Sequence, residues 1–227
     1  MEKTSINLPL KNIIRASEAS EKSPSVFFLH GFGSNMMDLY GLVGIFPPDW
    51  TCISLQASIP VQANGWAWAE LDFVNLPKLP KPEQMEDHQE SVILSVKEAI
   101  KQLNLDEKRV NLLGFSQGAS LSIFSGLMNP QLYNTVTALC GFMPVKEVVQ
   151  KIKNKDLSLM KLFMGNGVQD PVVALELADK TYDDLKKLGV LDPIYKKYDA
   201  EHTISNDCIR DFLHFLKTNN SLKKKPT

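Results

Sequence analysis

Residues Arg109 to Ala119 read RVNLLGFSQGA, and this stretch decides the fold. The apolar residues before Gly114 predict a short buried strand, and the apolar run from Ala119 onward predicts a helix. Between them, Gly114 and Gly118 flank Ser116 in a Gly-x-Ser-x-Gly pattern. A serine on a sharp strand-to-helix turn is a nucleophile elbow, in which glycines let strand and helix approach closely. The stretch therefore predicts an α/β fold that presents a reactive serine.

The surrounding strand and helix give the pattern its weight. Glycine and serine each make up roughly 7% of average sequences, so the bare pattern would arise by chance in about one chain in fifteen of this length. A nucleophile elbow needs an apolar strand before the pattern and an apolar helix after it, whereas an accidental match needs neither. Because both are present here, the pattern indicates an elbow.

The rest of the chain alternates strand-length apolar runs with helix-period segments, which is typical of βαβ units and a mostly parallel sheet. The predicted strands are 26–29, 52–55, 110–115, 136–140, 161–164 and 194–198, with an antiparallel edge around 13–14. The predicted helices are about 82–103, 117–128, 145–153, 172–188 and 205–217. We expect one α/β domain over 1–218, with a mostly parallel central sheet flanked by helices, and a flexible basic tail over 219–227.

Composition narrows the function classes. The chain has 227 residues, 44% of them hydrophobic and 22% charged, and a net charge of -1. This balance fits a globular protein and disfavours nucleic acid as a partner. No signal peptide, stable membrane anchor or spanning segment is expected, which predicts a cytoplasmic protein. The three cysteines, Cys52, Cys140 and Cys208, are widely spaced, so we expect neither a disulfide framework nor a metal site.

The stretch 57–82 is rich in proline and has no clean period. It follows a predicted strand and so lies at the edge where open α/β sheets bind ligands. Its large apolar residues are candidate substrate-binding groups: Trp66, Trp68, Phe73 and Leu76. Packing of the loop by the two tryptophans is the alternative interpretation, and both roles are compatible.

Ser116 needs a base, and His202 is the candidate. It lies between the last predicted strand and the last predicted helix, where a loop can carry it over the elbow. His88 and His214 fall inside predicted helices. His30 precedes a glycine-rich loop, which we expect it to shape by hydrogen bonding.

Asp170 is the candidate acid, because it follows a predicted strand and precedes Pro171. An aspartate before proline is also a helix-start signal, so a role as helix N-cap fits it equally well. Chain order favours the catalytic role, since serine, acid and histidine in sequence is the order of α/β-hydrolases. The alternative acids are Asp192, Asp199 and Glu201.

Backbone N–H groups are expected to form the oxyanion hole. Gln117, directly after the serine, supplies one donor. Phe32 is the candidate for the second, because Gly31 and Gly33 let this loop aim its backbone at a ligand. The loop lacks the further signatures of a phosphate-binding loop.

Together these motifs resemble the phospholipase/carboxylesterase family of α/β-hydrolases, which includes the acyl-protein thioesterases. The matching segments are 29–34, the loop with Trp68, 114–119, 167–173 and 201–202. The resemblance implies a compact α/β-hydrolase fold without a large lid domain and a serine esterase that needs no cofactor. It implies small-molecule or lipid acyl esters as substrates, with acylated proteins as a further class, and leaves a weak homodimer open.

The chain departs from the family pattern at Ala174, where proline is frequent, and at Glu201-His202-Thr203 in place of a Gly-x-x-His context. Neither change removes a catalytic group, but both leave acyl chain length and the choice between ester and thioester open. Two other functions stay open as alternatives: a serine peptidase-like hydrolase of the same fold, and a catalytically silent binding protein of this shape.

Overall fold

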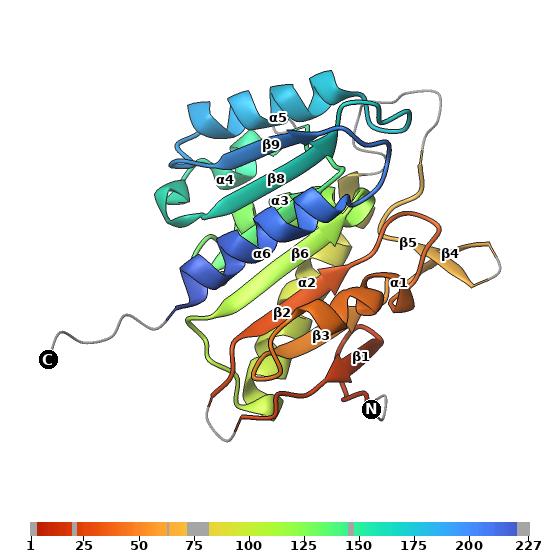
Figure 1. The fold of residues 1–227 in the computed structure, drawn as a ribbon, viewed down its shortest axis with the longest axis vertical. Coiled ribbons are helices and arrows are strands. Elements are labelled where there is room, and N and C mark those ends of the chain that lie inside the picture. Colours follow the sequence, from red (N-terminus) through yellow and green to blue (C-terminus); the bar gives the residue numbers. More distant parts are fainter. Residues whose placement is uncertain (1–3, 20–21, 63, 72–81, 145–147, 222–227) are drawn as a thin grey trace, which may run out of the picture.

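A central seven-stranded sheet organises the molecule (Figure 1). The computed structural model describes residues 4–19, 22–62, 64–71, 82–144 and 148–221. The sheet order is β1-β3-β2-β6-β7-β8-β9, and all neighbours pair in parallel except β1, which is antiparallel to β3. The predicted fold class, a mostly parallel sheet flanked by helices, is therefore confirmed.

The strands of this sheet are β1 (Asn12–Arg15), β2 (Ser25–Leu29), β3 (Thr51–Leu55), β6 (Val110–Phe115), β7 (Thr135–Leu139), β8 (Leu162–Gly167) and β9 (Ile194–Tyr198). The helices are α1 (Met37–Tyr40), α2 (Pro82–Leu103), α3 (Gln117–Met128), α4 (Val149–Ile152), α5 (Leu175–Lys187) and α6 (Asn206–Asn220), with 3-10 turns at Gly41–Ile45 and Leu157–Leu159.

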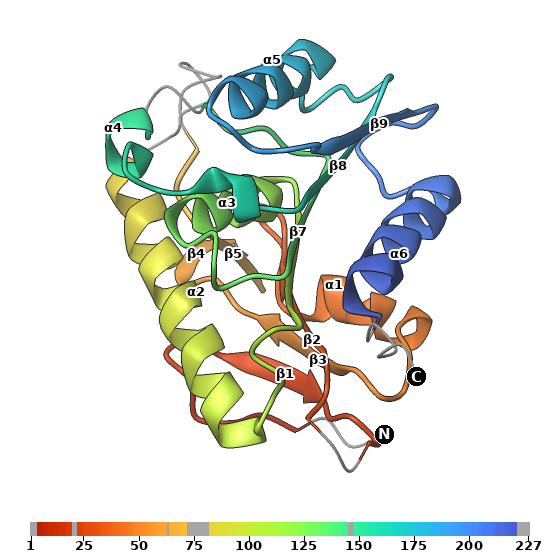
Figure 2. The same cartoon turned by 90° about the vertical axis from the view of Figure 1, so that its left-hand side faces the viewer.

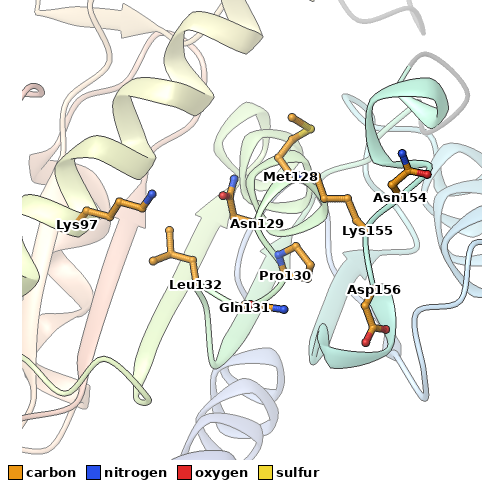
Figure 3. A pocket seen from close by; sticks show the side chains of 9 residues that line it. All are labelled: Lys97, Met128, Asn129, Pro130, Gln131, Leu132, Asn154, Lys155 and Asp156. Carbon is orange, nitrogen blue, oxygen red and sulfur yellow. The ribbon is translucent and has the colours of Figure 1, made fainter.

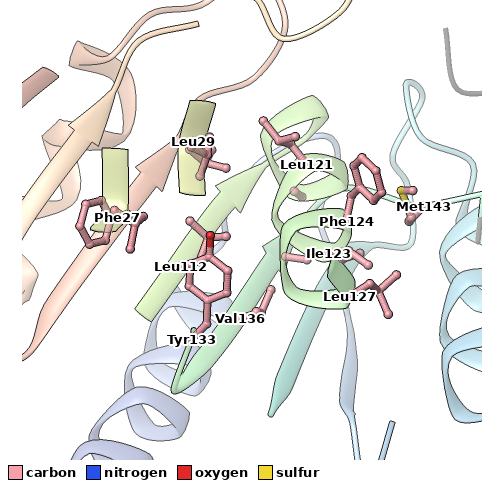
Figure 4. Close-up of a cluster of buried hydrophobic side chains, with 14 of the residues drawn as sticks. Phe27, Leu29, Leu112, Leu121, Ile123, Phe124, Leu127, Tyr133, Val136 and Met143 are labelled. Atoms are coloured by element: carbon pink, nitrogen blue, oxygen red, sulfur yellow. The ribbon is translucent and has the colours of Figure 1, made fainter. Parts of the chain in front are cut away.

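Helices cover both faces of the sheet, and each face has its own apolar core (Figure 2). The larger core joins the sheet to α2, α3 and α5, and Figure 4 shows Leu121, Ile123, Phe124 and Leu127 of α3 within it, with Phe124 next to Met143. The smaller core joins the other face to α1 and α6. Because α3 is buried almost all round, its apolar sequence holds the elbow at the centre of the molecule.

Most predicted elements have the observed bounds within a few residues. The helix over 82–103, the helix over 117–128 and the strand over 110–115 begin and end where predicted. Helix α5 begins at Leu175, three residues later than predicted, since residues 168–174 form a turn. Helix α4 is shorter than the predicted 145–153, and residues 145–147 lie outside the described part.

The end of α6 differs from the prediction of a tail from residue 219. The helix extends to Asn220, whose buried side-chain amide exchanges two hydrogen bonds of 3.0 Å with Asn111 of β6. These bonds anchor the helix end to the central strand, while residues 222–227 lie outside the described part.

The stretch 57–82 contains a small hairpin that was not predicted. Strands β4 (Ile59–Gln62) and β5 (Gly65–Ala67) pair in antiparallel fashion, with an irregular register around Pro60. Trp66 also forms a bridge with Ser34, so the hairpin rests on the glycine-rich loop. In the described residues, no helix has the length and hydropathy needed to cross a membrane.

Candidate active site

Ser116 lies at the tip of a strained turn between β6 and α3. Its φ of 53° and ψ of -118° are rare for a residue with a side chain, and its N–H donates to Leu139 O at 2.8 Å. A Cβ on Gly118 would lie 2.0 Å from Leu29 O, and one on Gly114 would lie 2.1 Å from Gly118 O. Only glycine fits at either position, so the close approach of strand and helix fixes the turn.

His202 bridges Ser116 and Asp170. Its Nε2 lies 2.9 Å from Ser116 Oγ, and its Nδ1 lies 2.7 Å from Asp170 Oδ2. The three residues follow the carboxyl ends of β6, β8 and β9, which meet at one edge of the parallel sheet. The contact with a carboxylate places the proton on Nδ1 and leaves Nε2 to accept from the serine hydroxyl.

The two carboxylate oxygens of Asp170 have different hydrogen-bond partners. Oδ2 faces His202, and Oδ1 accepts hydrogen bonds from the N–H groups of Val172 and Val173 at 2.8 and 2.9 Å. The N-cap of α5 is Ala174, so Asp170 orders a turn before the helix and does not cap it. Its side chain is fully buried, which leaves its orientation fixed by these partners.

Gly167, at the end of β8, brings the acid and histidine loops together. A Cβ there would lie 2.2 Å from Ala200 O and 2.4 Å from Glu201 O. Val168 N–H and Gln169 N–H also donate to Tyr198 O and Ala200 O, at 2.8 and 3.1 Å. The two loops therefore share backbone contacts along their whole approach to the site.

The alternative acids lie elsewhere. Asp192 is exposed and precedes β9, at the opposite end of the strand from His202. Asp199 accepts a hydrogen bond from Gln169 Nε2 at 2.8 Å, and Glu201 is exposed. In the described structure, Asp170 is the carboxylate bonded to His202.

The glycine-rich loop lies directly against the elbow. A Cβ built on Gly31 would lie 3.4 Å from Ser116 Cβ, so the backbone that leads into Phe32 passes beside the serine. Gly33 adopts a φ of 73°, and its N–H donates to Trp66 O at 2.9 Å. The N–H of Gln117 is the first of α3, where backbone donors have no partner within the helix.

Trp68 is a core residue that supports this loop. Its side chain is 0% exposed, its ring packs beside the rings of His30 and His88, and its Nε1–H donates to His30 O at 2.7 Å. For Trp68 the geometry favours the packing interpretation over direct substrate contact. Trp66 is half-buried on the hairpin, whereas Phe73 and Leu76 lie outside the described residues.

His30 and His88 are structural histidines with similar bonding. His30 places Nδ1 2.8 Å from Gly31 O and accepts from Ala57 N–H at Nε2, while His88 places Nδ1 3.0 Å from Gln84 O and accepts from Ser58 N–H. Burial lowers the pKa of both imidazoles below the ordinary value of 6.5, because charging them would cost hydration energy. His30 therefore shapes the loop by hydrogen bonding, as predicted.

Cys140 is buried beside the site, a position that the sequence analysis did not predict. It adopts a φ of 51°, and its thiol lies 3.4 Å from Thr203 O. Burial raises its pKa to about 12, and the nearby Asp170 charge adds to the rise. Cys140, Asp170 and His202 offer ligand atoms within 4.8 Å of one another, but the last two are hydrogen-bonded to each other at 2.7 Å. A metal ion bound about 2.0–2.2 Å from both the Asp170 and the His202 ligand atoms would have to push these atoms apart. The observed spacing therefore favours a hydrogen bond between Asp170 and His202 over a shared metal ion.

Two surface pockets differ in their relation to the site. One of about 450 Å³ lies at the end of α3, remote from Ser116, and Figure 3 shows its lining residues, among them Lys97 and Lys155. A smaller one, of about 190 Å³, adjoins the site. We call it the Asp38 pocket, and its lining residues are Asp38, Leu39, Leu42, Phe115, Thr203 and Ile204.

Comparison with known proteins places this geometry in context. A model of the phospholipase/carboxylesterase family matches residues 11–220. The chain is 28% identical over 165 residues to an acyl-protein thioesterase 1 from Debaryomyces hansenii, covering 70% of this chain and 71% of that one. It is 27% identical over 202 residues to acyl-protein thioesterase 1 homolog 2 from Dictyostelium discoideum, covering 80% and 85%.

Solved structures show the same fold. The structure of esterase PE8 superposes with a TM-score of 0.78 at 23% identity, covering 90% of this chain and 96% of that one. Acyl-protein thioesterase 2 from Zea mays superposes with a TM-score of 0.74 at 20% identity, covering 92% and 98%. These likenesses establish the α/β-hydrolase fold that the sequence predicted.

Proposed function

The chain belongs to the phospholipase/carboxylesterase family, and we propose that it is a serine hydrolase that cleaves carboxylic esters or thioesters through an acyl-enzyme on Ser116. The observation that carries the proposal is the position of the His202 ring, 2.9 Å from Ser116 Oγ and 2.7 Å from Asp170 Oδ2. A serine hydroxyl is a weak nucleophile unless a base removes its proton, and the position of this ring supports that role for His202.

In the first half of the reaction, Ser116 Oγ attacks the carbonyl carbon while His202 Nε2 takes the hydroxyl proton. Asp170 accepts the Nδ1–H bond, holds the required tautomer and stabilises the imidazolium that forms. His202 then gives the proton to the leaving oxygen or sulfur as the bond to the acyl carbon breaks. The acyl group stays on Ser116.

In the second half, a water molecule attacks the acyl carbon while His202 Nε2 takes a proton from the water. His202 then returns this proton to Ser116 Oγ as the bond between Oγ and the acyl carbon breaks, which releases the acid and restores the serine hydroxyl. Both tetrahedral intermediates carry a negative oxygen, which we assign to the N–H groups of Phe32 and Gln117. The support is the contact of the Gly31 backbone with Ser116 and the place of Gln117 at the start of α3. Removing one such donor costs about 3–4 kcal/mol of barrier lowering in other enzymes.

The substrate class that we propose is an acyl ester or thioester of a small molecule or lipid, with acylated proteins included. The names of the thioesterase relatives support the thioester arm, and the family description supports the ester arm. A kinetic series on esters and thioesters from acetyl to palmitoyl would define acyl length and the preference between oxygen and sulfur.

A fluorophosphonate probe tests the proposal directly. We expect it to label the wild-type chain on Ser116 and to leave Ser116→Ala unlabelled, whereas the half-buried control Ser17→Ala should label as wild type does. Equal labelling of Ser116→Ala would overturn the assignment. Turnover of aminoacyl amides in preference to acyl esters would instead favour the peptidase alternative.

A further inference from the structure

The Asp38 pocket adjoins the reacting groups through the residues next to them in sequence. Thr203 and Ile204 directly follow His202, and Phe115 directly precedes Ser116. The ring centroids of Phe115 and His202 lie 5.0 Å apart, so the pocket wall packs on the imidazole itself. Leu39 of α1 and Leu42 of the 3-10 turn after it also line the pocket.

The chemistry of acyl transfer indicates which part of a substrate extends into this pocket. The leaving oxygen or sulfur must come within hydrogen-bond reach of His202 Nε2, because that atom supplies its proton. The group attached to the leaving atom then continues past the imidazole. The walls formed by Phe115, Thr203 and Ile204 lie on the flank of that imidazole.

Asp38 gives the pocket a negative charge. Its carboxylate is exposed, and Oδ2 accepts a hydrogen bond from Ser34 Oγ at 2.9 Å, which orients it. Among the residues that the structure describes, no lysine or arginine forms an ion pair with it. The rest of the lining is mainly apolar, with one aromatic ring.

A carboxylate beside apolar walls and an aromatic ring fits an alkylammonium group, which gains from charge attraction and from the ring face. We propose that the Asp38 pocket receives the leaving alcohol or thiol, and that Asp38 selects leaving groups that carry an alkylammonium charge. This inference rests on the proposed serine hydrolase function and concerns the side of the substrate opposite to the acyl chain.

The test compares two esters with the same acyl group and leaving groups of the same shape. Butyrylcholine carries a quaternary nitrogen where 3,3-dimethylbutyl butyrate carries a carbon. We expect wild-type kcat/KM to favour butyrylcholine by roughly 3- to 10-fold, the range expected of a partly exposed charge pair and a ring contact. Asp38→Asn, which keeps an oxygen for Ser34, should bring the ratio close to one, because kcat/KM should fall more for butyrylcholine than for the neutral ester.

Asp183→Asn is the matched control, because it makes the same change of charge at an exposed position of α5, away from the pocket. Its ratio should equal that of wild type. Choline should also inhibit 4-nitrophenyl butyrate hydrolysis more strongly than 3,3-dimethylbutanol does, and Asp38→Asn should remove this difference.

The two proposals fail in different ways. A wild-type ratio near one, or an unchanged ratio in Asp38→Asn, overturns the role of Asp38. The serine hydrolase function still stands in that case if wild type hydrolyses 4-nitrophenyl butyrate and Ser116→Ala does not. Hydrolysis that persists in Ser116→Ala overturns both.

Discussion

The side chain of Gln117 is hydrogen-bonded at both ends to the backbone that carries Trp68. Oε1 accepts from Trp68 N–H at 2.8 Å, and Nε2 donates to Ala69 O at 2.7 Å. The Trp68 indole in turn donates to His30 O, next to the glycine-rich loop. The residue after the proposed nucleophile therefore connects the elbow to the loop that we assign to the oxyanion hole.

Gln117→Glu tests this connection. The carboxylate of Glu can still accept from Trp68 N–H, but it cannot donate to Ala69 O. One carboxylate oxygen would instead face Ala69 O, and residue 117 is only 8% exposed, so water cannot easily relieve this contact. We expect the free energy of unfolding, measured with urea, to fall by about 1–3 kcal/mol. Gln131→Glu makes the same change on an exposed residue and should leave stability within about 0.5 kcal/mol of wild type. An equal fall in both variants would contradict the role of Gln117.

Asp170→Asn is expected to lower kcat by about 10³- to 10⁴-fold with little change in melting temperature. The asparagine oxygen can keep the bonds to Val172 and Val173, but the NH₂ group would then face His202 Nδ1 and favour the wrong tautomer. Asp192→Asn is the matched control, because that carboxylate is exposed and lies before β9. A large loss of kcat in Asp192→Asn in place of Asp170→Asn would identify a different acid.

Gly118→Ala should prevent the native fold of the elbow. The added Cβ would lie 2.0 Å from Leu29 O and 2.6 Å from His30 O, and both atoms belong to the backbone of the central sheet region. We expect loss of folded protein, or a destabilisation of at least several kcal/mol, by circular dichroism and thermal melting. Gly44→Ala, where a Cβ meets nothing within 4 Å, should melt as wild type does.

The buried histidines predict a loss of stability in acid. Because burial lowers the pKa of His30 and His88 below 6.5, the unfolded chain binds more protons than the folded chain as the pH falls below that value. Their contribution is complete above about pH 6.5 and declines toward the folded-state pKa, with a slope of up to about 1.4 kcal/mol per pH unit for each proton.

Urea denaturation of His88→Gln between pH 7.5 and 5.0 checks this slope. The variant is expected to be less stable than wild type at pH 7.5, because the Ser58 and Gln84 contacts change, yet to lose less stability on acidification. His214→Gln, at an exposed position of α6, should follow the wild-type slope. The idea fails if His88→Gln declines as steeply as wild type.

Regular periodicity explains which elements could be predicted. Helix α2 repeats apolar residues at helical spacing, and β6 with α3 carries the elbow pattern, so their bounds matched. The hairpin of β4 and β5 was missed because Pro60 interrupts any alternation and the pairing depends on contacts with Ser34, distant in sequence.

Residue types and chain order were enough to predict the three site residues, but not the contacts that hold them in place. Ser116, His202 and Asp170 lie together where three predicted strands end, but the division of the Asp170 oxygens depends on a turn that has no sequence period. The burial of Trp68 likewise depends on hydrogen bonds from distant segments. The predicted cytoplasmic location and the weak homodimer stay predictions.

The position of β9 at the border of the sheet has a consequence for how this protein should fail under stress. In the described part of the chain, β9 pairs with β8 alone. Every residue of β9 is exposed or half-buried, whereas β6 has a neighbouring strand on each side. Strands of this kind open with less free energy than the global transition requires. Since the loop after β9 carries His202, hydrolysis should cease at lower denaturant concentration than the change in tryptophan fluorescence, to which the buried Trp50 and Trp68 contribute. Inactivation would then report local opening of β9, which reverses when the denaturant is diluted. The denaturant concentration at which half the activity is lost would therefore underestimate the free energy of global unfolding.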